Sequence, residues 1–188
     1  MSKIEKEPSN TYTSVAESVF QVERSAWNSC ANFIDDNRNI GNPFLSHEFF
    51  SCLEESGSVS KETGWISQHI LLFEKGNSLI GILPNYLKNH SWGEYIFDQV
   101  FANAWENAGG KYYPKLLSAI PFSPVAGERF LIKKGYSRKF VIEKLLDALE
   151  DLKKFYKVSS AHINFINEPQ LKIALKNKFW FERNNIQF

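Results

Sequence analysis

Residues 137–156, SRKFVIEKLLDALEDLKKFY, constrain the fold more than any other stretch of this sequence. Their apolar side chains recur at steps of three or four, the spacing of one face of an α-helix. These side chains are Val141, Leu145, Ala148, Leu152 and Phe155. An extended apolar segment precedes the helix (residues 129–135) and another follows it (residues 159–166). A long amphipathic helix between two strands indicates a sheet with helices packed against it.

The rest of the chain continues this alternation of strands and helices. The two apolar runs within residues 67–89 are separated by Lys75, Gly76 and Asn77, which predicts a β-hairpin. The remaining patterns predict strands at 14–22, 113–121 and 179–188 and helices at 23–35, 46–56, 97–108 and 168–178. We therefore expect an α/β (α+β) fold, with one mixed central sheet and helices on both of its faces.

Composition limits the possible partners and compartments. Lys and Arg (22) nearly cancel Asp and Glu (21), so a net charge of +1 predicts no specific nucleic-acid binding. Cys30 and Cys52 lack metal or redox spacing and are expected to be reduced core residues. Four scattered histidines predict no metal site. No transmembrane segment or leader is apparent, which predicts a cytoplasmic protein.

Length and polarity predict a single domain. A chain of 188 residues is long enough for one sizeable core. Residues 1–12 are polar and are expected to be flexible, so the domain is placed at 13–188.

The stretch GGKYYPKLLSAIPFSPVAGERFL, residues 109–131, contains the first group of candidate site residues. If it is extended, Tyr113 and Lys115 point to one side and Tyr112 to the other. A tyrosine beside an ammonium group suits a sugar or a carboxylate-bearing peptide, and Phe122 can form a wall of the same site. The alternative is that the prolines fix a crossover whose aromatic rings fill the core.

The segment NHSWGEY, residues 89–95, supplies a second group. His90 and Glu94 stand four residues apart in a predicted loop between a strand and a helix. Such a pair is able to perform acid/base chemistry. The alternative is that both residues make only turn and capping hydrogen bonds.

The order of elements is similar to that of the GNAT superfamily of acyltransferases. Three segments, NPFLSHEFFSCLEESGSV, HSWGEYIFDQVFANAWENAGGKYYPKLLSAIPFSPVAGERFL and FERNNIQF, resemble the bacterial FemAB-like family of peptidoglycan-biosynthesis-related GNAT-type acyltransferases. The resemblance runs from about Trp27 to Phe188. It implies two GNAT-like halves in tandem, of which this chain resembles the first.

The resemblance implies the N-terminal, acceptor-side half of an N-acyltransferase that transfers an acyl or aminoacyl group to an amine, such as a cell-wall precursor. The acceptor would be a small molecule or a peptide, and catalytic residues are not identified. Acyl-CoA or aminoacyl-tRNA would serve as donor only with a second half, so the chain alone is expected to be inactive. The alternative is a noncatalytic GNAT-like module that binds a peptide or a partner.

A GNAT donor site needs free backbone N–H groups between a strand and the next helix, where they hold the pyrophosphate of coenzyme A. The corresponding segment, IKKGYSRKFV, has one glycine where the usual loop has an Arg/Gln-x-x-Gly-x-Gly/Ala pattern. We therefore expect no cofactor to be bound by this half. The closing strand is expected to be exposed, and to pair with the missing half or with a second copy of the chain.

Overall fold

The computed structural model describes residues 5–33 and 41–184, and in these ranges it shows two four-stranded sheets. One sheet has the order β1-β3-β4-β7 and the other β2-β5-β6-β8. The strands are β1 (Thr11–Ala16), β2 (Trp65–Ser67), β3 (His69–Glu74), β4 (Ser78–Leu83), β5 (Tyr86–Lys88), β6 (Lys115–Ser118), β7 (Leu131–Ile132) and β8 (Ala161–Ile163). The α-helices are α1 (Arg24–Cys30), α2 (His47–Glu55), α3 (Gln99–Asn107), α4 (Arg138–Tyr156) and α5 (Glu168–Ala174).

The predicted hairpin is confirmed and links the two sheets. β3 and β4 pair antiparallel around the turn at Lys75–Asn77, where Gly76 has a φ of 92°. Each long arm of the hairpin then continues into the second sheet as β2 or β5. The arms are joined at the transition, where the Gln68 N–H donates to the Asn85 carbonyl at 2.7 Å.

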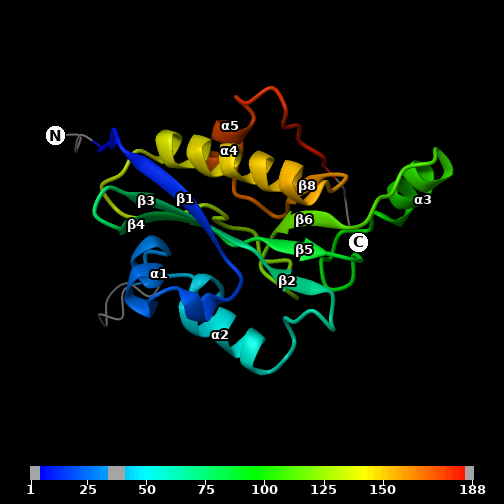
Figure 1. Ribbon diagram of the computed structural model, residues 1–188, viewed down its shortest axis with the longest axis horizontal. Coiled ribbons are helices and arrows are strands. Elements are labelled where there is room, and N and C mark those ends of the chain that lie inside the picture. The colour runs from blue at the N-terminus through cyan, green and yellow to red at the C-terminus, as the bar shows by residue number, and fades with distance from the viewer. Residues whose placement is uncertain (1–4, 34–40, 185–188) are drawn as a thin grey trace.

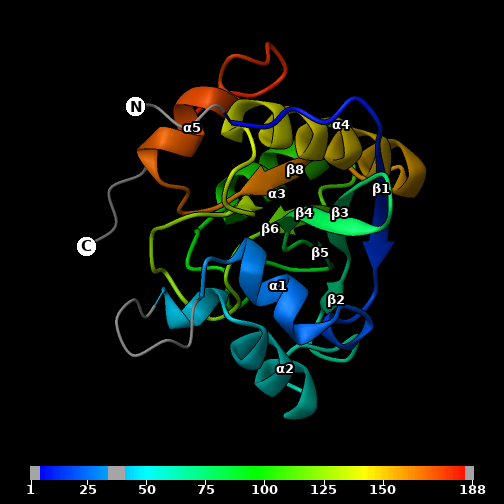
Figure 2. The same ribbon diagram turned by 90° about the vertical axis from the view of Figure 1, so that its left-hand side faces the viewer.

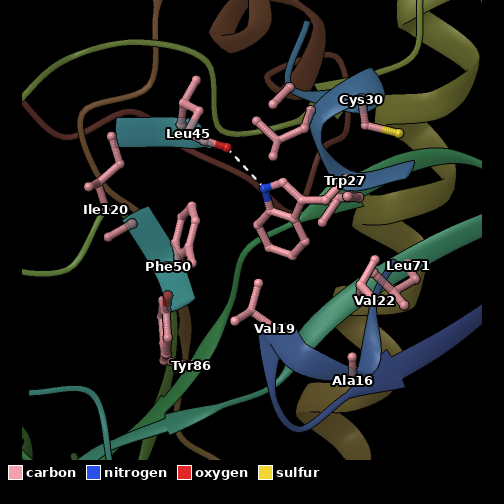
Figure 3. Packing of buried hydrophobic residues seen from close by; sticks show 14 of the residues in the cluster. Ala16, Val19, Val22, Trp27, Cys30, Leu45, Phe50, Leu71, Tyr86 and Ile120 are labelled. Carbon is pink, nitrogen blue, oxygen red and sulfur yellow. Dashed lines mark hydrogen bonds between the residues drawn. The ribbon is translucent and has the colours of Figure 1, made fainter. Parts of the chain in front are cut away.

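Helices cover both faces of the sheets, as expected. Figure 1 shows α4 and α5 on one side and α1 and α2 on the other, and Figure 2 shows the same layers from the end. The α4 side buries one apolar cluster that includes Leu145 and Leu149. The other side buries Trp27, whose indole N–H donates to the Leu45 carbonyl at 2.9 Å (Figure 3).

β6 pairs with β5 and β7 pairs with β4, which explains the glycine- and proline-rich stretch at residues 109–131. Leu117 pairs with Tyr86, and Leu131 pairs with Ile82. Leu117 and Leu131 are fourteen residues apart, whereas their partners are four apart. β6 and β7 therefore follow one line along the hairpin, and ten extra residues loop out between them.

Two boundary predictions are wrong. β1 covers Thr11–Ala16 rather than the predicted 14–22, and a short 3-10 helix (Val19–Gln21) follows it. The predicted closing strand at 179–188 is wrong for residues 179–184, which form no strand. Its last four residues, 185–188, lie outside the described residues. The end of the predicted helix at 23–35 also falls partly in residues 34–40, outside the described ranges.

Three helix and core predictions also need correction. Val141, Leu145 and Leu152 are buried as predicted, but Phe155 is 75% exposed, because the buried face of α4 extends to Ile142, Leu146 and Leu149. Cys52 is exposed, whereas Cys30 is buried as expected. α3 forms where predicted, but its apolar stripe faces away from the core and only Ala102 is buried.

Candidate functional site

The second sheet places two lysines opposite each other. Lys88 of β5 pairs directly with Lys115 of β6, and on its other side with Trp65 of β2. Both lysine residues are almost fully buried. Like charges at opposite positions of an antiparallel pair repel each other, and burial strengthens the effect. This arrangement therefore requires nearby anions.

Two carboxylates from the segment between β5 and α3 meet that requirement. The Lys115 ammonium lies 2.8 Å from Glu94 Oε2 and 2.5 Å from Asp98 Oδ2. Ser91 also donates to Asp98. Together these contacts fix the loop at residues 89–98 against the sheet.

The two tyrosines converge on the same carboxylate. The Tyr112 hydroxyl donates to Asp98 Oδ2 at 2.9 Å, and the Tyr113 hydroxyl donates to Asp98 Oδ1 at 3.3 Å. Their rings meet edge to face, with centroids 4.9 Å apart. The prediction that they point to opposite sides is wrong because the strand begins only at Lys115. The Lys115 ammonium lies 5.6 Å from the centres of both tyrosine rings and is buried in this network.

Lys88 has fewer polar partners than Lys115. Its ammonium lies 3.7 Å from the centre of the Trp65 ring and donates to the Trp92 carbonyl at 3.2 Å. Burial lowers the pKa of Lys88 to about 7, against the opposing effect of Glu94. Burial also raises the pKa of Glu94, whose Oε1 is buried and has no hydrogen-bond partner.

The other two candidate residues, His90 and Phe122, lie at the edge of this cluster. His90 is partly buried, and its Nδ1 accepts from the Trp92 N–H at 3.2 Å. Burial lowers the pKa of His90. Phe122 is 41% exposed and packs on Trp65 with ring centroids 5.4 Å apart. Its N–H donates to the Gly93 carbonyl, and a side chain at Gly93 would collide with the Phe122 ring.

The structure thus brings Glu94, Tyr112, Tyr113 and Lys115 into one buried cluster, with His90 and Phe122 at its rim. Sequence reasoning missed Lys88 and the role of Asp98, which makes no capping hydrogen bond to α3. A signal for Lys88 was present, since it shares a strand face with Tyr86. Burial thus disfavours the charged forms of Lys88 and Glu94, while each of the two groups favours the charged form of the other.

The loop between β7 and α4 is occupied by the chain itself. The Lys6 N–H donates to the Gly135 carbonyl at 2.8 Å, and the Ser137 N–H donates to the Lys6 carbonyl at 3.0 Å. The Lys6 ammonium also pairs with Glu74 at 2.5 Å. The N-terminal segment therefore occupies the Gly135 carbonyl and the Ser137 N–H, directly before α4.

A hollow of about 660 Å³ opens at the free edge of β2. Three carboxylates and one ammonium line it, from Glu17, Glu54, Glu55 and Lys61. Trp65 and Tyr156 contribute aromatic surface. A hollow of this size and charge suits a small cationic ligand.

The fold is that of GNAT acetyltransferases. The aminoglycoside 6'-N-acetyltransferase AAC(6')-Ih from Acinetobacter baumannii superposes with a TM-score of 0.51 at 11% identity, over 95% of this chain and 96% of that one. An acetyltransferase from Trypanosoma brucei gives a TM-score of 0.48 at 11% identity, over 95% and 97%. No match was found among curated proteins.

The sequence defines the family more narrowly. The FemAB-like family model, described as peptidoglycan biosynthesis/recognition, matches residues 18–188. This chain belongs to that family. Among its described residues, no helix has both the length and the apolar character needed to cross a membrane.

Proposed function

We propose that this chain is the acceptor-binding unit of a FemAB-like N-acyltransferase and that another unit supplies the acyl donor. The observation that carries the proposal is the loop between β7 and α4, where Lys6 bonds to Gly135 and Ser137. The loop also has only one glycine, so its backbone does not open toward a ligand. The family match and the GNAT fold support acyl transfer as the reaction class.

The acceptor in this proposal is an amine that enters the acidic hollow beside β2. Glu17 and Glu55 are exposed there, and their carboxylates attract an ammonium group. Glu54 is held in place by Ser18 and Ser67, which donate to it at 2.6 and 2.8 Å. Attack by the amine is then accelerated mainly by its orientation toward the acyl group and by a base that takes its proton.

Calorimetric titration with acetyl-CoA tests the donor half of the proposal. We expect no saturable heat from the folded 188-residue chain, and no acetyl transfer to added amines. A one-to-one isotherm at micromolar affinity would show that this unit holds the donor itself.

Titration with 1,5-diaminopentane tests the acceptor half. We expect saturable binding that the double variant Glu17→Gln/Glu55→Gln removes. Glu143→Gln, an exposed carboxylate on α4, is the matched control and should bind like the wild type. Equal binding by the double variant and the wild type would exclude the hollow as the acceptor site.

A further inference from the structure

α3 is an amphipathic helix whose apolar side is turned to solvent. Figure 1 shows it projecting from the end of the molecule, away from both layers of the core. Phe97 is 79% exposed and Val100 78%, while Phe101 and Trp105 are each 53% exposed. With the exposed Ala104 and Ala108, these residues follow helical spacing and form one continuous stripe, called here the α3 stripe.

The position of α3 is fixed by the buried network rather than by packing of the stripe. Asp98, directly before the helix, bonds to Lys115, Tyr112, Tyr113 and Ser91. On the helix itself, Ala102 is the buried residue. The buried network therefore holds the start of α3, while most of its apolar side is exposed to solvent.

The uncovered area matches an interface. The loop leading into α3 also exposes Trp92 (81%) and Tyr95 (49%). At the surface typical of large side chains, the four large residues of the stripe itself expose roughly 450 Å² of apolar area. A contiguous apolar patch of about 300–600 Å² is often a functional surface.

We propose that the α3 stripe is the contact surface of a homodimer, in which α3 of one chain packs against α3 of a second copy about a two-fold axis. The stripe has a large row, Phe97, Phe101 and Trp105, beside a small row, Val100, Ala104 and Ala108. When the two-fold axis runs along the helices, so that the two copies of α3 are parallel, the large row of each copy faces the small row of the other.

The charges near the stripe favour a second copy over a lipid or nucleic-acid surface. From residue 95 to 112 the charged residues are the buried Asp98, Glu106 and Lys111. The Arg183 guanidinium lies over the Phe101 ring at 4.0 Å. The surroundings of the stripe thus carry both positive and negative charges, and opposite charges of two identical copies can pair. An anionic membrane, by contrast, attracts helices with an excess of Lys and Arg.

This contact replaces the self-association expected through the closing strand, since residues 179–184 form no strand to pair. It is independent of the donor and acceptor proposals. A negative result in either titration does not affect the dimer proposal, and a monomeric protein does not affect the donor and acceptor proposals.

Sedimentation velocity over a hundredfold concentration range tests the proposal. We expect a monomer–dimer equilibrium that Phe101→Glu shifts to monomer. Phe155→Glu is the matched control, because Phe155 is equally aromatic, 75% exposed and on α4, and it should dimerise like the wild type. A wild type that stays monomeric at every concentration, or dimers unaffected by Phe101→Glu, would overturn the proposal.

Thiol crosslinking gives a second readout that does not depend on a charged substitution. In a Cys52→Ser background, Val100→Cys lies in the stripe, whereas Asn103→Cys lies beside it on the same helix. We expect mild oxidation to give a covalent dimer for Val100→Cys and little for Asn103→Cys. Equal crosslinking of the two, or a monomer that co-sediments with phosphatidylglycerol vesicles, would contradict the dimer.

Discussion

At the scale of single residues, the structure is shaped by two buried lysines that face each other across β5 and β6. Lys115 is neutralised by Glu94 and Asp98, while Lys88 rests on Trp65 and keeps a lowered pKa. The two lysines therefore have different consequences when they are replaced.

Lys115→Ala should destabilise the protein strongly, because it leaves two carboxylates buried without their cation. Breaking a buried pair in this way costs roughly 3–5 kcal/mol, comparable to the roughly 2–5 kcal/mol expected for Leu117→Ala in the core. Urea unfolding measures both. The exposed Lys111→Ala is the control and should change stability by less than about 0.5 kcal/mol. If Lys115→Ala is as stable as Lys111→Ala, the buried network does not stabilise the fold.

Lys88→Met should change the pH dependence of stability. Between pH 7 and 10.5 the unfolded chain holds a proton on Lys88 that the folded protein releases, so the wild type gains stability as pH rises. Below pH 7 both states are protonated and the full penalty of burying the charge is present. The stability of Lys88→Met relative to the wild type should therefore be highest below pH 7 and fall toward pH 10. Unfolding midpoints that differ by a constant amount across this range would contradict the lowered pKa.

Sequence reasoning found four members of the cluster but not their arrangement. Local patterns show polar and aromatic groups near turns, and they identified Glu94, Tyr112, Tyr113 and Lys115. Their meeting at Asp98 depends on the register of β5 against β6, which sets Lys88 opposite Lys115. Pairing register is a long-range property that a single strand pattern does not contain.

At the scale of elements, helices were predicted more reliably than the surfaces they bury. α2 begins where predicted, with Ser46 as a cap that accepts from the Phe49 N–H, and α3 ends beside Gly109 with a φ of 84°. The stripe on α3 has the same spacing as a core-facing stripe. The spacing of apolar residues identifies the apolar face of a helix but not what covers that face. The exposure of the α3 stripe was therefore not predictable.

α5 offers a prediction at this scale because one of its side chains joins it to the residues directly before β7. Gln170 is fully buried, and its Oε1 accepts from the Arg129 N–H at 2.8 Å and the Phe130 N–H at 3.1 Å. Its Nε2 donates to the Phe130 carbonyl at 2.7 Å. Gln170→Leu leaves these backbone groups unsatisfied and should destabilise the protein by at least about 2 kcal/mol.

The control for that variant is Lys172→Ala on the same helix, where the ammonium pairs with Glu168 at an exposed position. We expect it to change stability by less than about 0.5 kcal/mol. If thermal unfolding gives the two variants equal stability, Gln170 does not anchor α5.

At the scale of the whole molecule, the order of strands and helices was sufficient to indicate the fold class. The hairpin, the long α4 and the strand on each side of it fix the sheets, and the family and the fold are both confirmed. The path of the N-terminal segment was not predictable. Lys6 reaches the β7–α4 loop through backbone hydrogen bonds that carry no sequence signature.

The amide signals of Gly135 and Ser137 test the central claim most directly. In a ¹⁵N-labelled protein titrated with acetyl-CoA, we predict that both signals stay in place and that the Ser137 amide remains protected from hydrogen exchange by the Lys6 carbonyl. Saturable movement of both signals, with loss of Ser137 protection, would mean that the loop releases Lys6 and holds the donor, and would contradict an acceptor-side unit.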